Sequence, residues 1–180
     1  MKKLFFILMI LLSIEAMSQT DPCKYYFLFG GGTSLLGTGD MKTLMFENEA
    51  DVILNHYAAF GISIGYGRSN RGVYETASFV QGNLNGYISP FRNNRKNDFR
   101  IGAGLGLMNI SDARAVSSIM VDGEIYDDYG FRTRNAFGVN IVLEDNYSIT
   151  ERFTLGIKLF TLPYKGDINS GVLFRLGVKI

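Results

Sequence analysis

Charged side chains recur at two-residue spacing in several segments of this chain. Glu47, Glu49 and Asp51 alternate with less polar residues, so an extended strand would place the three carboxylates on one face. Buried charges are costly unless they are paired, so an interior that collected these acids would need basic partners. The polar positions of other segments supply further charged residues: Arg100, Arg134, Glu144, Lys158, Arg175 and Lys179.

Two functions could follow if these charged faces meet in one interior. Paired charges would fill a narrow lumen as a plug, with Arg175, Arg134 or Arg100 opposite the acidic strand. Rings of charge could instead set the preference of a selective pore. A barrel of about eight strands has an interior only wide enough for side chains. We therefore favour the plug over the pore.

A second acidic group lies between residues 112 and 130. It consists of Asp122, Glu124, Asp127 and Asp128. Carboxylate oxygens are ligands of divalent cations, so one interpretation is a cation site at a lipopolysaccharide surface. The interpretation we favour is a solvated acidic loop.

The usual signatures of catalysis are weak in this chain. Residues 61–65 match the G-x-S-x-G pattern of hydrolases, but that motif needs a sharp turn between strand and helix. Here Ile62 and Ile64 continue a strand pattern, and no serine lies within three residues of His56, the one histidine of the chain. The Gly-rich residues 32–39 lack the Lys-Ser/Thr pair of a phosphate-binding loop. We expect no enzyme activity, no cofactor and no catalytic metal.

The elements that would position these residues are strands. Apolar and polar residues alternate in the segment 98–107, where Phe99, Ile101, Ala103, Leu105 and Leu107 face one way. The segment 41–54 is the ambiguous one, because its residues also suit an amphipathic helix. An even strand number is the rule for single-chain bacterial barrels, which favours the strand. The eight expected strands are 25–34, 41–54, 60–67, 78–89, 98–107, 137–144, 153–160 and 171–180.

The amino-terminal residues predict export. Lys2 and Lys3 precede an apolar run over residues 4–12, and small residues follow, so we expect a signal peptide over 1–18, a short leader over 19–23 and a barrel over 24–180. One cysteine, Cys23, excludes an internal disulfide, and we assign it to the leader. Removing Lys2, Lys3 and Glu15 takes the formal charge from +1 to zero. A neutral chain has no basic footprint for nucleic acid.

The polar face distinguishes a membrane barrel from a soluble one. A face in water usually carries long charged side chains, whereas this one is largely Gly, Ser and Asn with isolated charges. The opposite face is apolar, with aromatic residues near strand ends, which is typical of a transmembrane barrel. We expect short inner turns at 55–57, 93–97 and 145–151. The outer loops would then be 36–40, 68–72, 112–130 and 165–169, the third being the longest.

These features resemble the small eight-stranded outer-membrane β-barrel proteins of Gram-negative bacteria, the OmpA/OmpX/OmpW-like group. The resemblance covers residues from about 24 to 180, and its most specific part is the alternating segment 171–180. It implies an all-β, antiparallel, up-and-down barrel in the cell outer membrane. It also implies that the barrel-assembly machinery reads the carboxyl-terminal strand. The family usually ends on an aromatic residue, whereas this chain has Ile180.

We therefore expect a non-enzymatic outer-membrane protein with a structural or surface-interaction role. Its surroundings would be outer-membrane lipid and lipopolysaccharide, and we expect a monomer. The alternative from another class is a small channel for hydrophobic or small polar solutes, as in OmpW-like barrels. A lipid-modifying hydrolase is the third possibility. Bilayer conductance separates the first two.

Overall fold

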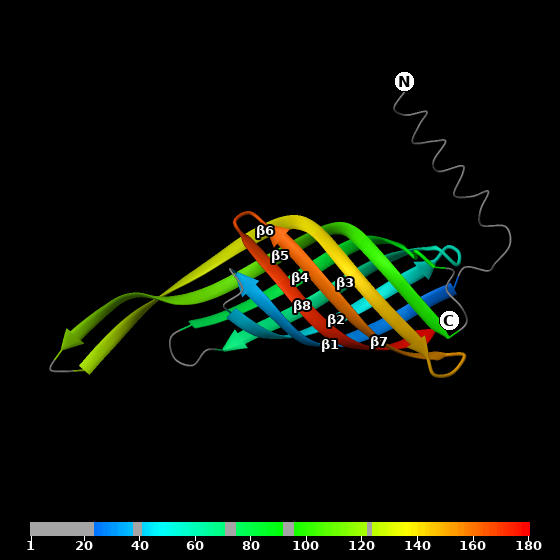
Figure 1. Ribbon diagram of the computed structural model, residues 1–180. Helices are drawn as coiled ribbons and strands as arrows, with labels where there is room; N and C mark the ends of the chain where they lie inside the picture. The colour runs from blue at the N-terminus through cyan, green and yellow to red at the C-terminus, as the bar shows by residue number, and fades with distance from the viewer. Residues whose placement is uncertain (1–23, 38–40, 71–74, 92–95, 122–123) are drawn as a thin grey trace, which may run out of the picture.

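The chain folds into eight antiparallel strands that close into one barrel (Figure 1). The computed structural model describes residues 24–37, 41–70, 75–91, 96–121 and 124–180. The expected signal peptide (1–18) and leader (19–23) lie outside the described residues. The strands are β1 Lys24–Gly37, β2 Met41–Ile53, β3 Ala58–Asn70, β4 Glu75–Ile88, β5 Asn97–Val121, β6 Glu124–Ser148, β7 Phe153–Tyr164 and β8 Asp167–Lys179.

Each strand pairs with its neighbour in sequence, and β1 pairs with β8 to close the wall. Reciprocal backbone hydrogen bonds between Tyr25 and Ile180 (3.1 and 2.8 Å) fasten the carboxyl-terminal strand to the first strand. The eight expected strands are confirmed. Residues 41–53 form β2, so the helix alternative for this segment is wrong. Inward and outward side chains alternate along β2, which sets its two faces.

The strands are staggered, and this decides which side chains meet inside. Following paired residues once around the wall from Tyr25 leads back to β1 at Leu35, ten residues further along. A stagger of this size requires the strands to tilt by about 40° from the barrel axis. A residue of β2 therefore lies level with residues of β7 and β8 that a flat register would not bring near it.

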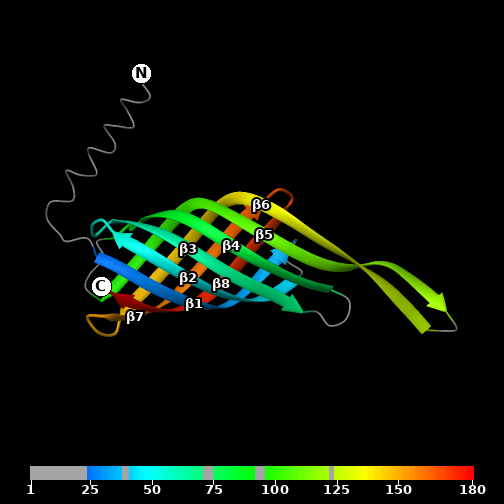
Figure 2. The same ribbon diagram turned by 180° about the vertical axis from the view of Figure 1, so that it is seen from behind.

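The long outer loop expected at 112–130 is wrong. β5 continues to Val121, β6 begins at Glu124, and their pairing runs through Val121 and Glu124 with one irregularity between Ala115 and Ser117. The segment forms a two-stranded hairpin that projects beyond the other strands (Figure 1 and Figure 2). It leaves the barrel at the end away from the carboxyl terminus in both views. β-branched and aromatic residues of this segment favour strand over loop.

Two other connections are shorter than expected. β7 runs on to Tyr164 and β8 starts at Asp167, so Lys165 and Gly166 alone form the outer turn. Gly166 has φ = 82°, a left-handed conformation that glycine adopts without a steric penalty. At the opposite end β6 continues to Ser148, which shortens the inner turn to residues 149–152.

Several inward positions carry glycine because large side chains lie directly across them. A Cβ added to Gly67 would collide with the Phe79 ring, and one added to Gly102 would lie 2.5 Å from the Tyr87 ring. The Gly-rich polar face thus leaves room for aromatic rings inside the barrel. In the part of the chain that the structure describes, no helix is long and apolar enough to cross a membrane.

Candidate functional site

The outside of the barrel is an apolar band. Ile62 and Ile64 on β3 are each 59% exposed, and Leu107 on β5 is 63% exposed. Beyond Leu107 the outward face of the long strands turns polar, with a 2.7 Å hydrogen bond between Asn109 and Asn135. An exposed aliphatic surface that encircles the wall would be a liability in water and suits the hydrocarbon of a bilayer.

Aromatic side chains lie at the edges of this band. Tyr25, Tyr147 and Phe153 are about half exposed at the end where the chain enters and leaves the barrel. Tyr66 and Phe137 are similarly exposed toward the hairpin end. Such girdles are typical of transmembrane barrels, because aromatic rings favour the headgroup region.

The centre of the lumen holds a network of opposite charges. Glu49 on β2 accepts hydrogen bonds from Lys158 on β7 (2.6 Å) and Arg175 on β8 (2.8 Å). Lys158 also bridges to Glu47 at 2.6 Å, and Arg175 bridges to Glu144 at 2.9 Å. Each of these side chains is at most 2% exposed. We call these five residues the central network.

A second ionic group lies on the carboxyl-terminal side of the central network. Arg100 on β5 bridges to Asp51 at 2.9 Å and makes a very short contact with Asp98. The Arg100 guanidinium also lies over the rings of Tyr26 (5.5 Å) and Tyr87 (5.9 Å). The sequence singled out Arg100 and Asp51 but missed Asp98, which lies at the very start of β5.

Amide and hydroxyl groups extend the polar lining across two more strands, β3 and β4. Ser63 donates to Glu47 (3.2 Å), and Asn83 donates to Ser63 (3.0 Å). Gln81 donates to Asn83 (3.0 Å), and Asn169 donates to Gln81 (2.7 Å). This chain of hydrogen bonds runs from Glu47 through β3 and β4 to Asn169 on β8. The Tyr87 hydroxyl makes a further short hydrogen bond to Glu49.

Arg134 was assigned to the same network, and that assignment is wrong. It lies near the base of the hairpin, where it bonds to Asp167 (2.8 Å) and approaches Asp112 (3.7 Å). Its guanidinium also lies over the Tyr164 ring. Partial burial acts to lower the pKa of Arg134, but the hydrogen bond to Asp167 and the charge of Asp112 raise it. The stagger carries Arg134 several residues beyond the level of Glu49 and Asp51.

Lys179 lies at the opposite end of the barrel. Its ammonium group donates to Ser148 and sits 5.0 Å from the centre of the Tyr26 ring. The structure thus places Lys179 beside the aromatic residue of β1, at the level of Arg100. It contributes a positive charge to the lining of this end.

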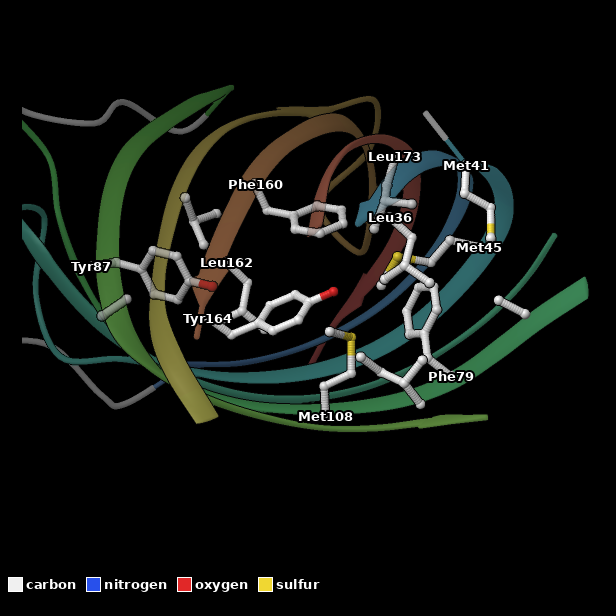
Figure 3. Close-up of a cluster of buried hydrophobic side chains, with 14 residues drawn as sticks. Leu36, Met41, Met45, Phe79, Tyr87, Met108, Phe160, Leu162, Tyr164 and Leu173 are labelled. Carbon is white, nitrogen blue, oxygen red and sulfur yellow. The ribbon is translucent and has the colours of Figure 1, made fainter. Parts of the chain in front are cut away.

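The half of the lumen nearer the hairpin holds a cluster of apolar side chains, which the sequence did not indicate. Side chains from β1, β2, β4, β5, β7 and β8 point toward one another there (Figure 3). Met45, Leu162 and Leu173 are completely buried within it. The labelled residues at this end are Leu36, Met41, Met45, Phe79, Met108, Phe160, Leu162, Tyr164 and Leu173. Tyr87 belongs to the same buried set but lies toward the other end of the lumen, beside Arg100.

The remaining candidates lie apart from these groups. Glu124, Asp127 and Asp128 lie in strand β6 and not in a loop. Their partners on β5 are Val121, Ser118 and Ser117. Asp122 lies outside the described residues. Among the described residues no three His, Cys, Asp or Glu side chains gather in a way that could hold a metal ion.

The G-x-S-x-G match is part of a regular strand. Residues 61–65 lie within β3, where Ser63 is buried and faces the lumen. His56 is exposed in the turn between β2 and β3. The structure therefore does not bring this serine and histidine together as a nucleophile and its base.

Solved structures share this fold, although no family model and no curated protein matches the sequence. The barrel resembles Ail of Yersinia pestis, with a TM-score of 0.62 and 10% identity over 89% of this chain and 100% of that one. It resembles a major outer membrane protein of Thermus thermophilus, with a TM-score of 0.62 and 11% identity over 88% and 99%. Neisserial surface protein A gives a TM-score of 0.59 and 12% identity over 88% and 97%. The fold is that of a small outer-membrane β-barrel.

Proposed function

We propose that this outer-membrane barrel protein acts at the cell surface as a non-enzymatic interaction protein, with its lumen plugged by side chains. The observation that carries the proposal is the β5–β6 hairpin, which extends far beyond the other strands (Figure 2). β4 begins at Glu75, opposite Arg114, and β7 ends at Tyr164, opposite Gly138. Beyond these points the outer edges of β5 and β6 pair with no other strand of the described chain. Unpaired strand edges are templates for strand addition by a partner.

The hairpin also carries a particular charge. Between residues 112 and 132 the sequence has five acids and two arginines: Asp112, Asp122, Glu124, Asp127, Asp128, Arg114 and Arg132. Ail has been solved in complex with sucrose octasulfate, a heparin analogue. An acidic hairpin would repel such a polyanion. We propose instead a partner with basic groups or with an extended segment that can pair with the edge.

The lumen supports a plug more than a channel. Charged side chains of four strands are buried and ion-paired at its centre, and an apolar cluster fills its outer half. A solute would have to break several ion pairs in a low-dielectric interior to pass. The protein in planar bilayers should therefore show no discrete conductance steps. Steady conductance would support the small-channel alternative and refute the plug.

The surface role can be tested with a hairpin deletion. Cells displaying the full chain should adhere to a surface coated with a basic protein and not to a heparin-coated one. Deleting residues 113–129 should abolish adhesion while the unheated protein still runs as a folded barrel on gels, because the removed segment lies beyond the band. A second variant, Asp127→Asn with Asp128→Asn, keeps the hairpin but removes two negative charges. It should weaken adhesion to the basic surface in proportion to the charge removed. Adhesion that survives the deletion would refute the role of the hairpin.

A further inference from the structure

One polar side chain interrupts the apolar exterior at the middle of the band. Asn48 is exposed on β2, with Phe29 of β1 and Ile64 of β3 directly opposite it in the register. Both neighbours are outward-facing apolar residues. The outward residues of β2 in the band are Leu44, Phe46, Asn48, Ala50 and Val52, so Asn48 is the central one. The amide group therefore faces the hydrocarbon core and not a headgroup layer.

Two other outward polar pairs are satisfied within the wall. Thr161 and Ser170 share a hydrogen bond of 2.7 Å, and Asn109 donates to Asn135 at the band's edge. The Asn48 side chain has no hydrogen bond to any part of the chain that the structure describes. Acyl chains offer neither donors nor acceptors, and an amide left without a partner in an apolar medium is costly. A second molecule that presents a polar group at this depth would satisfy the amide.

We propose that the partner is a second copy of this chain, packed through the outer face of β2. A primary amide carries both a donor and an acceptor, so two Asn48 side chains related by a two-fold axis can form two reciprocal N–H···O bonds. Isologous pairs of this kind are the commonest form of homo-oligomer. Lipid headgroups and lipopolysaccharide sugars lie at the membrane surfaces and do not reach the level of Asn48.

The surface around Asn48 allows two barrels to approach. The side chain of Ala50 ends at Cβ, and its neighbours in the strand pairing are Phe27 of β1 and Ile62 of β3. Phe46 stacks on Phe29 with ring centres 6.4 Å apart on the same outer face. Small residues at an interface let backbones come close enough for polar groups to pair in lipid.

The dimer would leave the hairpin free. In the closed strand order β2 lies across the barrel from β6, so a contact through β2 keeps both β5–β6 hairpins away from the interface. Dimerisation is therefore independent of the proposed surface role. It replaces the monomer expected from the sequence.

The test is energy transfer between labelled copies in liposomes over a range of protein-to-lipid ratios. Cys23→Ser removes the native thiol, and Glu151→Cys in the exposed inner turn carries donor or acceptor dye. We expect a saturable monomer–dimer equilibrium for the protein with Asn48. Asn48→Leu should weaken dimerisation about tenfold or more, because it removes both reciprocal bonds. Asn48→Gln, which keeps an amide, should retain part of the association.

Asn109→Leu is the matched control, because it replaces an outward asparagine whose partner is Asn135 on the same barrel. It should leave the dimer constant unchanged, and all variants should show the gel shift of a folded barrel. Energy transfer no greater than random proximity for the protein with Asn48 would overturn the proposal. Equal weakening by Asn48→Leu and Asn109→Leu would also overturn it. A photo-crosslinker at position 48 that captures a different polypeptide in native membranes would replace the second copy with that partner.

Discussion

Replacing Arg175 by glutamine tests whether the buried ion pairs of the central network stabilise the barrel. The Arg175 side chain is 1% exposed and bridges two carboxylates, Glu49 at 2.8 Å and Glu144 at 2.9 Å. Glutamine keeps much of the volume but removes the charge. Glu49 would retain Lys158 and the Tyr87 hydroxyl as partners. Glu144 would lose its one ion pair in the described structure and remain as a buried carboxylate.

The expected cost follows from that asymmetry. Removing one partner of a buried ion pair typically destabilises a protein by about 3–5 kcal/mol. We expect Arg175→Gln to fall in that range. Glu49→Gln should cost less, about 1.5–3 kcal/mol, which is the value of hydrogen bonds to a charged group, because Arg175 keeps Glu144 and Lys158 keeps Glu47. In the double variant the two costs should not add, and the coupling should be about 0.5–3 kcal/mol.

The assay is reversible urea unfolding in detergent micelles, followed by circular dichroism and by the mobility of unheated samples. Arg134→Gln is the control, because Arg134 also bridges two carboxylates but its side chain is 28% exposed at the aqueous end. Its cost should be about 1 kcal/mol or less, as for exposed ion pairs. The central network would be refuted if Arg175→Gln cost no more than Arg134→Gln, or if Glu49→Gln cost more than Arg175→Gln.

Two further predictions concern the wall. Leu105→Arg puts a charge on the lipid face and should cost about 2–4 kcal/mol in liposomes, while Thr133→Arg, outside the band, should cost about 1 kcal/mol or less; equal costs would contradict the position of the band. Gly104→Ala should destabilise the barrel in urea titrations, because its Cβ would collide with the Leu84 carbonyl oxygen, whereas Gly82→Ala, with its nearest atom at 4.0 Å, should be nearly neutral. If Gly104→Ala left the free energy of unfolding unchanged and Gly82→Ala lowered it, the packing around these two glycines would be wrongly assigned.

Parity along each strand could be predicted from the sequence because it is a local property. The alternation of Glu47, Glu49 and Asp51 with Phe46, Asn48 and Ala50 fixes which residues share a face, whatever the strand pairs with. The buried set that this parity indicated includes Arg100, Glu144, Lys158 and Arg175. Their pairing with the acids of β2 follows from having opposite charges in one narrow interior.

The height of each residue along the barrel axis could not be predicted, because it depends on the stagger between strands. That is why Arg134 bonds to Asp167 and not to Glu49. The apolar lumen cluster was missed for a different reason. Met45 and Leu162 share the parity of Glu47 and Lys158 and so face the lumen, but apolar side chains were expected on the lipid side. The hairpin did leave a signal, since an Asp-Gly pair at residues 122–123 between β-branched and aromatic residues is a hairpin pattern. The acidic composition of the segment favoured a solvated loop instead.

In the transmembrane barrel, the odd-numbered residues of β5 face lipid within the band and the even-numbered residues face the lumen. Nitroxide labels at single positions from Phe99 to Leu107, in liposomes, measure this directly through collision with oxygen and with a water-soluble nickel complex. We expect oxygen accessibility to peak at Ile101, Ala103, Leu105 and Leu107 and to fall at the positions between them, with little access of nickel to the lipid-facing sites. Accessibility without a period of two, an inverted period, or nickel access along the apolar face would contradict the transmembrane barrel.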